Sequence, residues 1–329
     1  QTNLRAQLYS NFKHQLSLPQ NEAGEVRAIV GSTPLAMTME DIKGRALMKR
    51  EEVDVIQLAL PVYGANDTQV LNNLRQAVAS LQEAWTGQRP SAIPMVPEEL
   101  TMEVFLNLPT TQEAIQNHAL PIAISCEEAE IIPINLSTLK NIVVLSESKQ
   151  ALQYTICHLV SVINHCLDNG HVLLVDSNEE YSFLKEKANA YISGEEILDL
   201  FSNLDKEITN RKETPKDVQT FIVIPDLTSF VEKVSISEDE FYQLYINAYK
   251  YGLHFITAGS KSVFFKVNPV IKVIKENITT AVIAMRLYDQ SIVEHNSNNR
   301  EKKLEWDQAY IYDKGRTQKV KLIKQEIEE

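Results

Sequence analysis

Short apolar runs alternate with amphipathic segments of helical length between residues 131 and 258. Runs rich in Ile and Val predict strands, and apolar residues that recur every three to four positions predict helices. This alternation predicts an α/β domain whose mostly parallel sheet is covered by helices on both faces, with ligands at the carboxyl ends of the strands. We expect strands at 131–136, 141–145, 171–176, 220–224 and 253–258, and helices at 67–85, 150–166, 193–211 and 238–251.

The composition narrows the classes of function. The 329 residues are 44% hydrophobic, enough for a sizeable core, and the net charge is −12. An acidic surface repels phosphate, so we expect no nucleic-acid partner, and a DNA translocase is disfavoured. The three cysteines are Cys126, Cys157 and Cys166, an odd and widely spaced set that favours a reducing compartment over a disulfide framework.

The two ends of the chain resemble each other. Ile29 precedes Ala46 by 17 positions, and Ile292 precedes Ala309 by the same 17 positions. Each alanine lies in a run that leads into a β-rich stretch, and Asn11 and Asn277 open the two copies. Self-similarity at a fixed interval indicates a repeated unit. The alternative is a pair of unrelated β meanders.

On the repeat interpretation, residues 1–62 are the closing strands of a preceding module or a linker, and residues 63–329 are one complete domain with a β-rich tail. The first residue is Gln1 rather than Met, so we expect a fragment of a longer protein. No run in it approaches the ~20 apolar residues that a membrane-spanning helix needs.

The segment after strand 141–145 has the place of a phosphate-binding loop but not its residues. The pattern G-x-x-x-x-G-K-[ST] uses glycines to turn backbone amides toward phosphates, a lysine to reach them, and a hydroxyl to bind Mg²⁺. Aligned from the end of the strand, the eight positions read Ser146, Glu147, Ser148, Lys149, Gln150, Ala151, Leu152 and Gln153. All four signature positions are changed, and residues 88–169 contain no glycine. We therefore expect a vestigial loop, and we assign Lys149 to the surface.

A second element of a nucleotide site is a strand that ends in a metal-binding acid. Residues 220–226 read TFIVIPD, so Pro225 stands where that acid is expected and Asp226 follows one position later. We interpret Asp226 as a turn or cap carboxylate. We expect no zinc at Cys157, His158, His165 and Cys166, because seven or eight residues of helix rise ~10–12 Å.

Several segments together resemble the terminal ATPase domain of the FtsK/SpoIIIE-type motor proteins of the Gram-positive type VII secretion system, the EssC family. One departure is Pro121-Ile122-Ala123-Ile124, where the family usually has Pro-Ile-Gly-Leu. Order and spacing carry the resemblance, and the matching residues are 44–47, 85–87, Pro94, Val96, Pro97, 120–124, 146–153, 223–226 and 252–257.

This resemblance implies a P-loop NTPase-like fold of the RecA/FtsK type, on the cytoplasmic face of the membrane in a membrane-anchored protein. It implies as partners WXG-type helical-hairpin substrates, other secretion components and neighbouring ATPase modules of the same chain. It also implies ATP and Mg²⁺, whereas the residues at 146–153 predict no cofactor, no catalytic residue and no metal site. The leading hypothesis is a catalytically degenerate docking and regulatory module, and the alternative is an active ATP-hydrolysing translocase with a remodelled phosphate loop.

Overall fold

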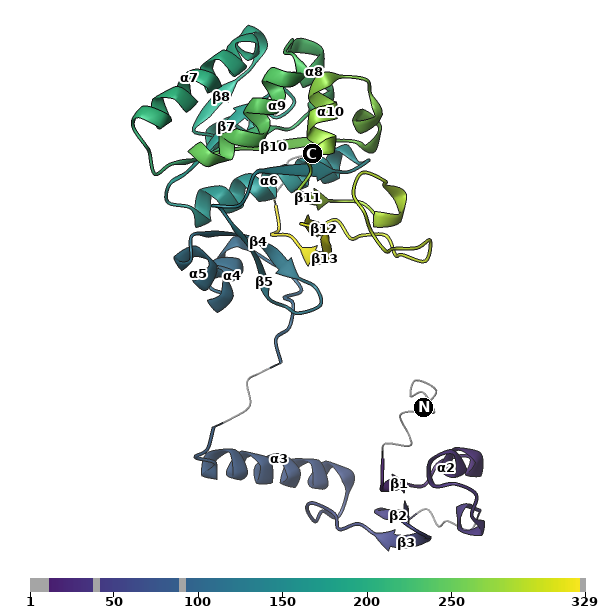
Figure 1. Ribbon diagram of the computed structural model, residues 1–329. Helices are drawn as coiled ribbons and strands as arrows, with labels where there is room; N and C mark the ends of the chain where they lie inside the picture. The colour runs from purple at the N-terminus through teal and green to yellow at the C-terminus, as the bar shows by residue number, and fades with distance from the viewer. Residues whose placement is uncertain (1–11, 38–41, 89–92, 326–329) are drawn as a thin grey trace. The chain divides into compact units, whose positions relative to one another are not determined.

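A computed structural model describes residues 12–37, 42–88 and 93–325. Its contacts divide the chain into two compact units, residues 1–91 and residues 92–329 (Figure 1). Within the described ranges, no helix is long and apolar enough to cross a bilayer.

The first unit is built on an antiparallel sheet in which β2 lies between β1 and β3. A turn at Gly44 leads into β2 with a φ of +82°, and a Cβ there would lie 2.6 Å from the carbonyl oxygen of Leu58, so only glycine fits. The elements are β1 (Gln15–Ser17), α2 (Ala23–Val30), η1 (Pro34–Ala36), β2 (Arg45–Lys49), β3 (Val53–Gln57) and α3 (Asp67–Ala84).

The second unit forms, among its described residues, a ten-stranded sheet in the order β5-β4-β13-β12-β11-β6-β10-β9-β7-β8. The strands from β11 to β8 in this order are parallel, and those from β5 to β11 pair antiparallel. The strands are β4 (Ala119–Ser125), β5 (Ile131–Asn135), β6 (Asn141–Leu145), β7 (Gly170–Val175), β8 (Ala190–Ile192), β9 (Gln219–Ile224), β10 (Leu253–Gly259), β11 (Thr280–Ile283), β12 (Gln308–Asp313) and β13 (Arg316–Lys321).

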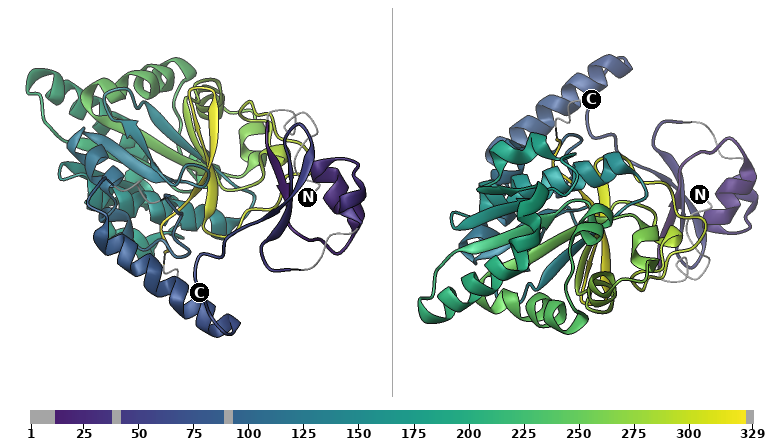
Figure 2. Two further views of the ribbon diagram at one scale, coloured as in Figure 1. Left: turned by 90° about the horizontal axis from the view of Figure 1, so that it is seen from below. Right: turned by 90° about the horizontal axis from the view of Figure 1, so that it is seen from above.

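Helices cover both faces of this sheet, as Figures 1 and 2 show. Ile142 and Val144 of β6 pack into the core that contains α6, whereas Val143 and Leu145 pack into the core that contains α7 to α10. The predicted two-sided α/β fold is confirmed. The helices are α4 (Met102–Leu106), α5 (Pro109–Gln116), α6 (Lys149–Cys166), η2 (Ser182–Lys187), η3 (Gly194–Asp199), α7 (Leu200–Glu213), α8 (Leu227–Lys233), α9 (Glu238–Asn247), η4 (Ala248–Tyr251), η5 (Lys261–Phe265), α10 (Pro269–Glu276) and η6 (Leu287–Asp289).

The strands of the first unit match the last strands of the second unit in order and spacing. β12 begins 263 positions after β2 (308 − 45), and β13 begins 263 positions after β3 (316 − 53). Ala46 and Ala309, which this offset aligns, are both fully buried. One part of the expectation was wrong: Ile29 and Val30 end helix α2, so the first stretch is not β structure throughout. The Asn11 start lies outside the described residues.

The last described segment runs along one face of α6. The Tyr154 hydroxyl donates to the Ile323 carbonyl at 2.8 Å, and the Ile323 amide donates to His158 Nδ1 at 3.1 Å. His158 Nε2 therefore carries the ring proton and donates it to the Ile122 carbonyl at 2.7 Å. Burial lowers the pKa of His158 to about 4, so the ring stays neutral.

Candidate functional site

The predicted phosphate loop is a short connection that leads into a helix. β6 ends at Leu145 and α6 begins at Lys149, which leaves three connecting residues. Ser148 is the N-cap, and its Oγ accepts the Ala151 amide at 3.3 Å. Positions 146–153 were aligned with the P-loop pattern, and the helix was expected from residue 150. It begins at Lys149, because Ser148 caps it.

The side chains of the connection bind parts of the protein. Ser146 is 1% exposed, and its Oγ donates to the Ala284 carbonyl at 2.9 Å. The Glu147 carboxylate accepts the Lys261 amide at 2.9 Å. The Ser148 amide donates back to Ser146 Oγ at 3.2 Å. These contacts fix the three residues against β11 and the segment after β10.

The helical positions offer no phosphate ligand. The Lys149 ammonium pairs with Glu180 at 2.6 Å. Leu152, at the position of the P-loop lysine, is buried in the core, and its amide donates to the Ser148 carbonyl at 3.0 Å. Gln150 is exposed, whereas Ala151 and Gln153 are half-buried. Neither glycines nor a free cation at the lysine position occur among these described residues.

Asp226 follows β9 by two residues, near the position where the sequence analysis considered a metal-binding acid. It is the N-cap of α8, and its Oδ1 accepts the Thr228 amide at 2.9 Å. Its Oδ2 accepts the Ser229 hydroxyl at 2.5 Å and the Asn178 amide at 3.1 Å. Pro225 precedes it between β9 and α8. The Oδ1 atom of Asp226 caps α8, as the cap interpretation expects, and Oδ2 is held by the side chains of Ser229 and Asn178.

Among the described residues, no group of three or more His, Cys, Asp or Glu side chains could hold a metal ion. Burial raises the pKa of the Cys157 thiol to about 11 and that of Cys166 to about 12. These thiols are inert core groups of α6.

A hollow of about 1020 Å³ remains beside the β6–α6 connection. Tyr154 and Trp306 form one wall, with ring centroids 5.2 Å apart and the rings edge to face. Arg286 lines it and pairs with Asp289 at 2.7 Å. Sequence analysis could not find this hollow, because residues 303–306 of its lining lie far along the chain from Tyr154.

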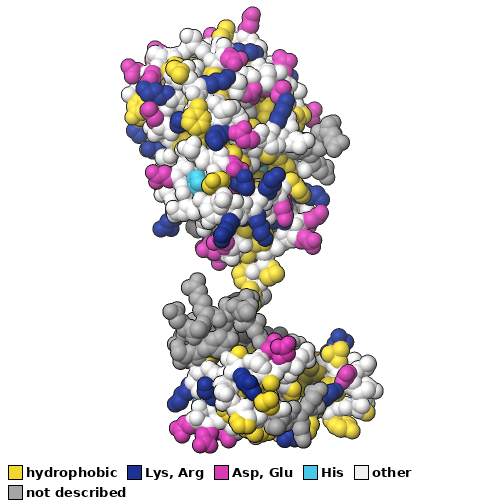
Figure 3. All heavy atoms as spheres, turned by 90° about the vertical axis from the view of Figure 1, so that its right-hand side faces the viewer, with side chains coloured by type: hydrophobic (Ala, Val, Ile, Leu, Met, Phe, Trp, Pro, Cys, Tyr) yellow, Lys and Arg dark blue, Asp and Glu magenta, His cyan; other side chains and the backbone are white. Residues whose placement is uncertain are grey.

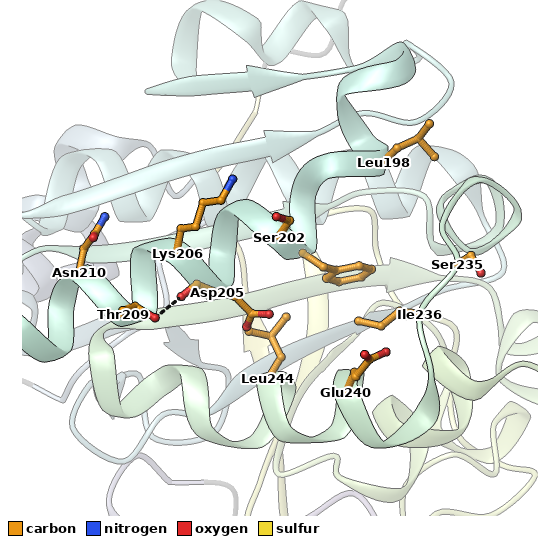
Figure 4. Close-up of a pocket in the computed structure, with 11 residues that line it drawn as sticks. Leu198, Ser202, Asp205, Lys206, Thr209, Asn210, Ser235, Ile236, Glu240 and Leu244 are labelled. Atoms are coloured by element: carbon orange, nitrogen blue, oxygen red, sulfur yellow. Dashed lines mark hydrogen bonds between the residues drawn. The ribbon is translucent and has the colours of Figure 1, made fainter.

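A second hollow, of about 590 Å³, lies between α7 and α9 and is here called the α7–α9 trough (Figure 4). Leu198, Phe201, Ile236 and Leu244 give it an apolar lining, and Leu198 is 64% exposed. Phe201 also packs on the buried rings of the core below it. Sequence analysis missed this trough, since only tertiary packing places the two helices side by side.

The rim of the trough carries carboxylates. Figure 4 shows Asp205 and Glu240 directed into the space between the helices. A neighbouring hollow of about 530 Å³ shares Asp205, Glu240 and Leu244, so the trough continues along α9. An apolar channel with charged rims between two helices is a geometry that accepts a third, amphipathic helix.

The parallel sheet, the strand-to-helix connection at its carboxyl edge and the second strand that ends at the same edge define the fold of a P-loop NTPase domain. No family model matches the chain. It is, however, 22% identical over 325 residues to the type VII secretion system protein EssC of Staphylococcus aureus strain MRSA252, covering 97% of this chain and 22% of that protein. The chain thus spans about a fifth of the length of this curated relative.

Solved structures give the same result for the fold. ATPases 2 and 3 of EssC from Geobacillus thermodenitrificans match with a TM-score of 0.74 and 19% identity, over 98% of this chain and 63% of that one. ATPases 2 and 3 of Thermomonospora curvata EccC, in complex with a signal sequence peptide, match with a TM-score of 0.53 and 17% identity, over 86% of this chain and 54% of that one. The resemblance to EssC-type ATPase domains is confirmed.

Proposed function

We propose that this chain is a terminal, catalytically degenerate ATPase-like module of a type VII secretion motor that acts in substrate docking and in regulation of protein export. The observation that carries the proposal is the start of α6 at Lys149, directly after three connecting residues. The Ser148 amide donates to Ser146 Oγ, the Ala151 amide to Ser148 Oγ and the Leu152 amide to the Ser148 carbonyl, so these amides are already bonded within the protein and do not wrap a triphosphate as a glycine-rich loop does.

ATP and Mg²⁺ do not fit the residues present. Leu152 stands in the core at the lysine position, and Lys149 is paired with Glu180. Asp226 caps α8 through Oδ1, and its Oδ2 accepts the Ser229 hydroxyl. A nucleotide would therefore meet no cation at the P-loop lysine position and no free metal-binding carboxylate at Asp226. On this ground we assign no catalytic residue and no resident cofactor.

The domain boundary forms part of the proposal. Residues 1–62 are the closing strands of a preceding module, and residues 63–329 are the ATPase-like domain. The common offset of 263 positions between β2–β3 and β12–β13 supports this division. Contacts place α3 with the first unit, which suggests that the physical separation lies at residues 91–92, after that helix.

Docking is proposed at the α7–α9 trough, for an amphipathic helical segment of a WXG-type hairpin substrate. The apolar floor suits aliphatic anchors, and Asp205 and Glu240 on the rim suit a basic residue beside them. The signal sequence peptide bound to the related EccC protein supports peptide recognition by modules of this fold. Other secretion components and neighbouring ATPase modules are further partners, at the cytoplasmic face of the cell membrane as part of a membrane-anchored protein.

The alternative function is an active translocase with a remodelled phosphate loop. The hollow of about 1020 Å³ beside the connection favours it, because it leaves room for a base and a ribose. Calorimetric titration of the chain with ATP and Mg²⁺ separates the two. We expect no heat of tight binding and no phosphate release. Micromolar affinity with Mg²⁺-dependent turnover would establish the alternative.

A further inference from the structure

The two helices that border the α7–α9 trough run in the same direction. Near their first turns the rings of Phe201 and Phe241 lie 5.7 Å apart, and near the far end the Lys212 ammonium lies 5.3 Å from the centre of the Tyr251 ring. α7 leads into β9, and α9 with η4 leads into β10, which is parallel to β9. The trough therefore has one end at the carboxyl edge of the sheet and the other at the amino edge.

Three carboxylates line the carboxyl-edge half of the trough and of the hollow that continues it. They belong to Asp205 of α7 and to Asp239 and Glu240 of α9, and all three residues are exposed. The Ser237 hydroxyl donates to the Glu240 carboxylate at 2.7 Å and lowers its pKa, so the group stays ionised. Figure 4 shows Lys206, also of this lining, directed away from α9. This half of the trough is therefore negative.

The amino-edge half carries lysines instead. Lys212 and Lys250 line the continuing hollow and are exposed. Each contacts a neutral group, since Lys212 lies over the Tyr251 ring and the Lys250 ammonium donates to Asn247 Oδ1 at 2.8 Å. On the face of the second unit that Figure 3 presents, acidic and basic side chains are interspersed, whereas along the trough they are separated by sign.

Helix dipoles oppose these side chains but do not reverse them. Two helix N-termini add about +0.5 each at the carboxyl-edge end, and two C-termini add about −0.5 each at the amino-edge end. Three carboxylates exceed the first contribution, and two ammonium groups exceed the second. The side chains therefore set one negative and one positive end. Asp205 and Lys212 lie seven positions apart, ~10 Å along α7.

We infer that the trough accepts a helix of one polarity and one order of charges. The N-terminal half of this helix carries a basic residue beside Asp205 and Glu240, and an acidic residue seven positions later lies beside Lys212 and Lys250. Aliphatic residues three and four positions after the basic one face Leu244, because positions with these spacings share one side of a helix. The inference rests on the proposed docking function and names the kind of segment that the trough selects.

Two synthetic peptides test the order of charges. The forward peptide has Lys, two Leu and Glu at these spacings, and the reverse peptide exchanges the Lys and the Glu. A hydrocarbon staple on the opposite side keeps both peptides helical, so their own helix stability does not decide the result. In fluorescence anisotropy with the full chain at low salt, the forward peptide should bind roughly tenfold more tightly than the reverse peptide.

A charge exchange within α7 provides the matched variant. D205K/K212E keeps the net charge and removes the difference in sign between the two ends, so it should bind the two peptides within roughly twofold of each other. E186K/K187E makes the same exchange at exposed residues of η2, outside both hollows, and should keep the preference of the parent chain. Circular dichroism checks that both variants are folded.

Equal binding of the two peptides by the parent chain would overturn the inference, as would tighter binding of the reverse peptide, no binding of either, or a preference that survives D205K/K212E. The docking function is measured apart, with a WXG-type hairpin protein and Leu198→Glu. Hairpin binding that this substitution weakens, with no preference between the peptides, would leave the docking function and reject the order of charges. A forward preference with no effect of Leu198→Glu on the hairpin would keep the order of charges and reject the hairpin as the ligand.

Discussion

The Lys149 ammonium lies 2.6 Å from the Glu180 carboxylate, so the first residue of α6 is joined to the loop after β7. Both side chains are largely exposed, at 61% and 42%. The pair holds the basic group nearest the β6–α6 connection in contact with an acid of the same unit.

Releasing Lys149 should not create a nucleotide site. For Glu180→Gln we expect a change in the free energy of unfolding of about 0–1 kcal/mol, since exposed ion pairs contribute little. ATP affinity should remain undetectable, because Leu152 and the helical amides are unchanged. Urea unfolding and calorimetry with ATP and Mg²⁺ measure the two quantities. ATP binding gained by this variant would give Lys149 a phosphate role.

Asp226 should act as a helix cap. Asp226→Asn keeps an oxygen for the Thr228 amide, so we expect nearly unchanged stability and nearly unchanged secretion in cells. Asp226→Ala should cost about 0.5–2 kcal/mol, the usual loss of an N-cap. Urea unfolding compares the two variants. Loss of secretion in the Asn variant with its stability intact would indicate a metal-binding acid instead.

The free energy of unfolding should fall as the pH drops below 6.5, the ordinary pKa of histidine. The pKa values of His158 and His254 are lowered to about 4 by burial, whereas in the unfolded chain they are near the ordinary 6.5. Between these values the unfolded chain binds more protons, so protonation favours unfolding. With both groups the slope approaches ~2.7 kcal/mol per pH unit.

Urea unfolding between pH 5 and 6.5 measures this slope, above the range where most carboxylates titrate. His158→Gln should roughly halve it, because one of the two groups is removed. A slope unchanged by the substitution would mean that His158 titrates normally in the folded protein.

The second unit should fold without the first. A truncation that starts near Asn66 removes the sheet β1-β2-β3, which has its own small core of Val26, Val30, Ala36 and Leu47. We expect a soluble product with a single cooperative thermal transition, and the same for a truncation that starts near residue 92. Aggregation or a broad transition of both products would reject the module boundary.

The α7–α9 trough should respond to a charge on its rim. Leu198→Glu puts a carboxylate at a residue that is already 64% exposed, so we expect normal folding. Binding of a purified WXG-type hairpin protein should weaken roughly tenfold, about 1.4 kcal/mol. Val267→Glu, at a fully exposed apolar residue outside the trough, is the control and should bind normally. Equal binding by both variants would show that the docking site lies outside the α7–α9 trough.

The sequence predicted the parallel half of the sheet well, because its strands are continuous apolar runs. β6 occupies the predicted range of residues 141–145, and α6 begins one residue earlier than predicted. The shorter helices α8 and α10 were missed, since seven or eight residues are too few for a periodic pattern. Each begins at a capping side chain, Asp226 and Asn268. Asp226 was interpreted as a turn or cap carboxylate, but the helix that follows it was not predicted.

The β6–α6 connection is one residue shorter than predicted, residues 146–148 instead of 146–149. The eight positions were counted from the P-loop pattern, while Ser148 is itself a strong N-cap residue. The N-cap preference of Ser148 therefore determines where the helix begins, and the P-loop pattern does not. The hollow beside Tyr154 and the trough beside Phe201 could not be predicted, because their walls meet only through tertiary packing.

The position of β13 has a consequence for how the protein is made. This strand lies between β12 and β4 in the sheet, and the residues just after it bond to Tyr154 and His158 across 165 to 171 positions of sequence. During synthesis, β4 and α6 leave the ribosome long before these partners exist. The edge of β4 and this face of α6 therefore stay unpaired, open to wrong pairing, until residues 316–325 have been translated.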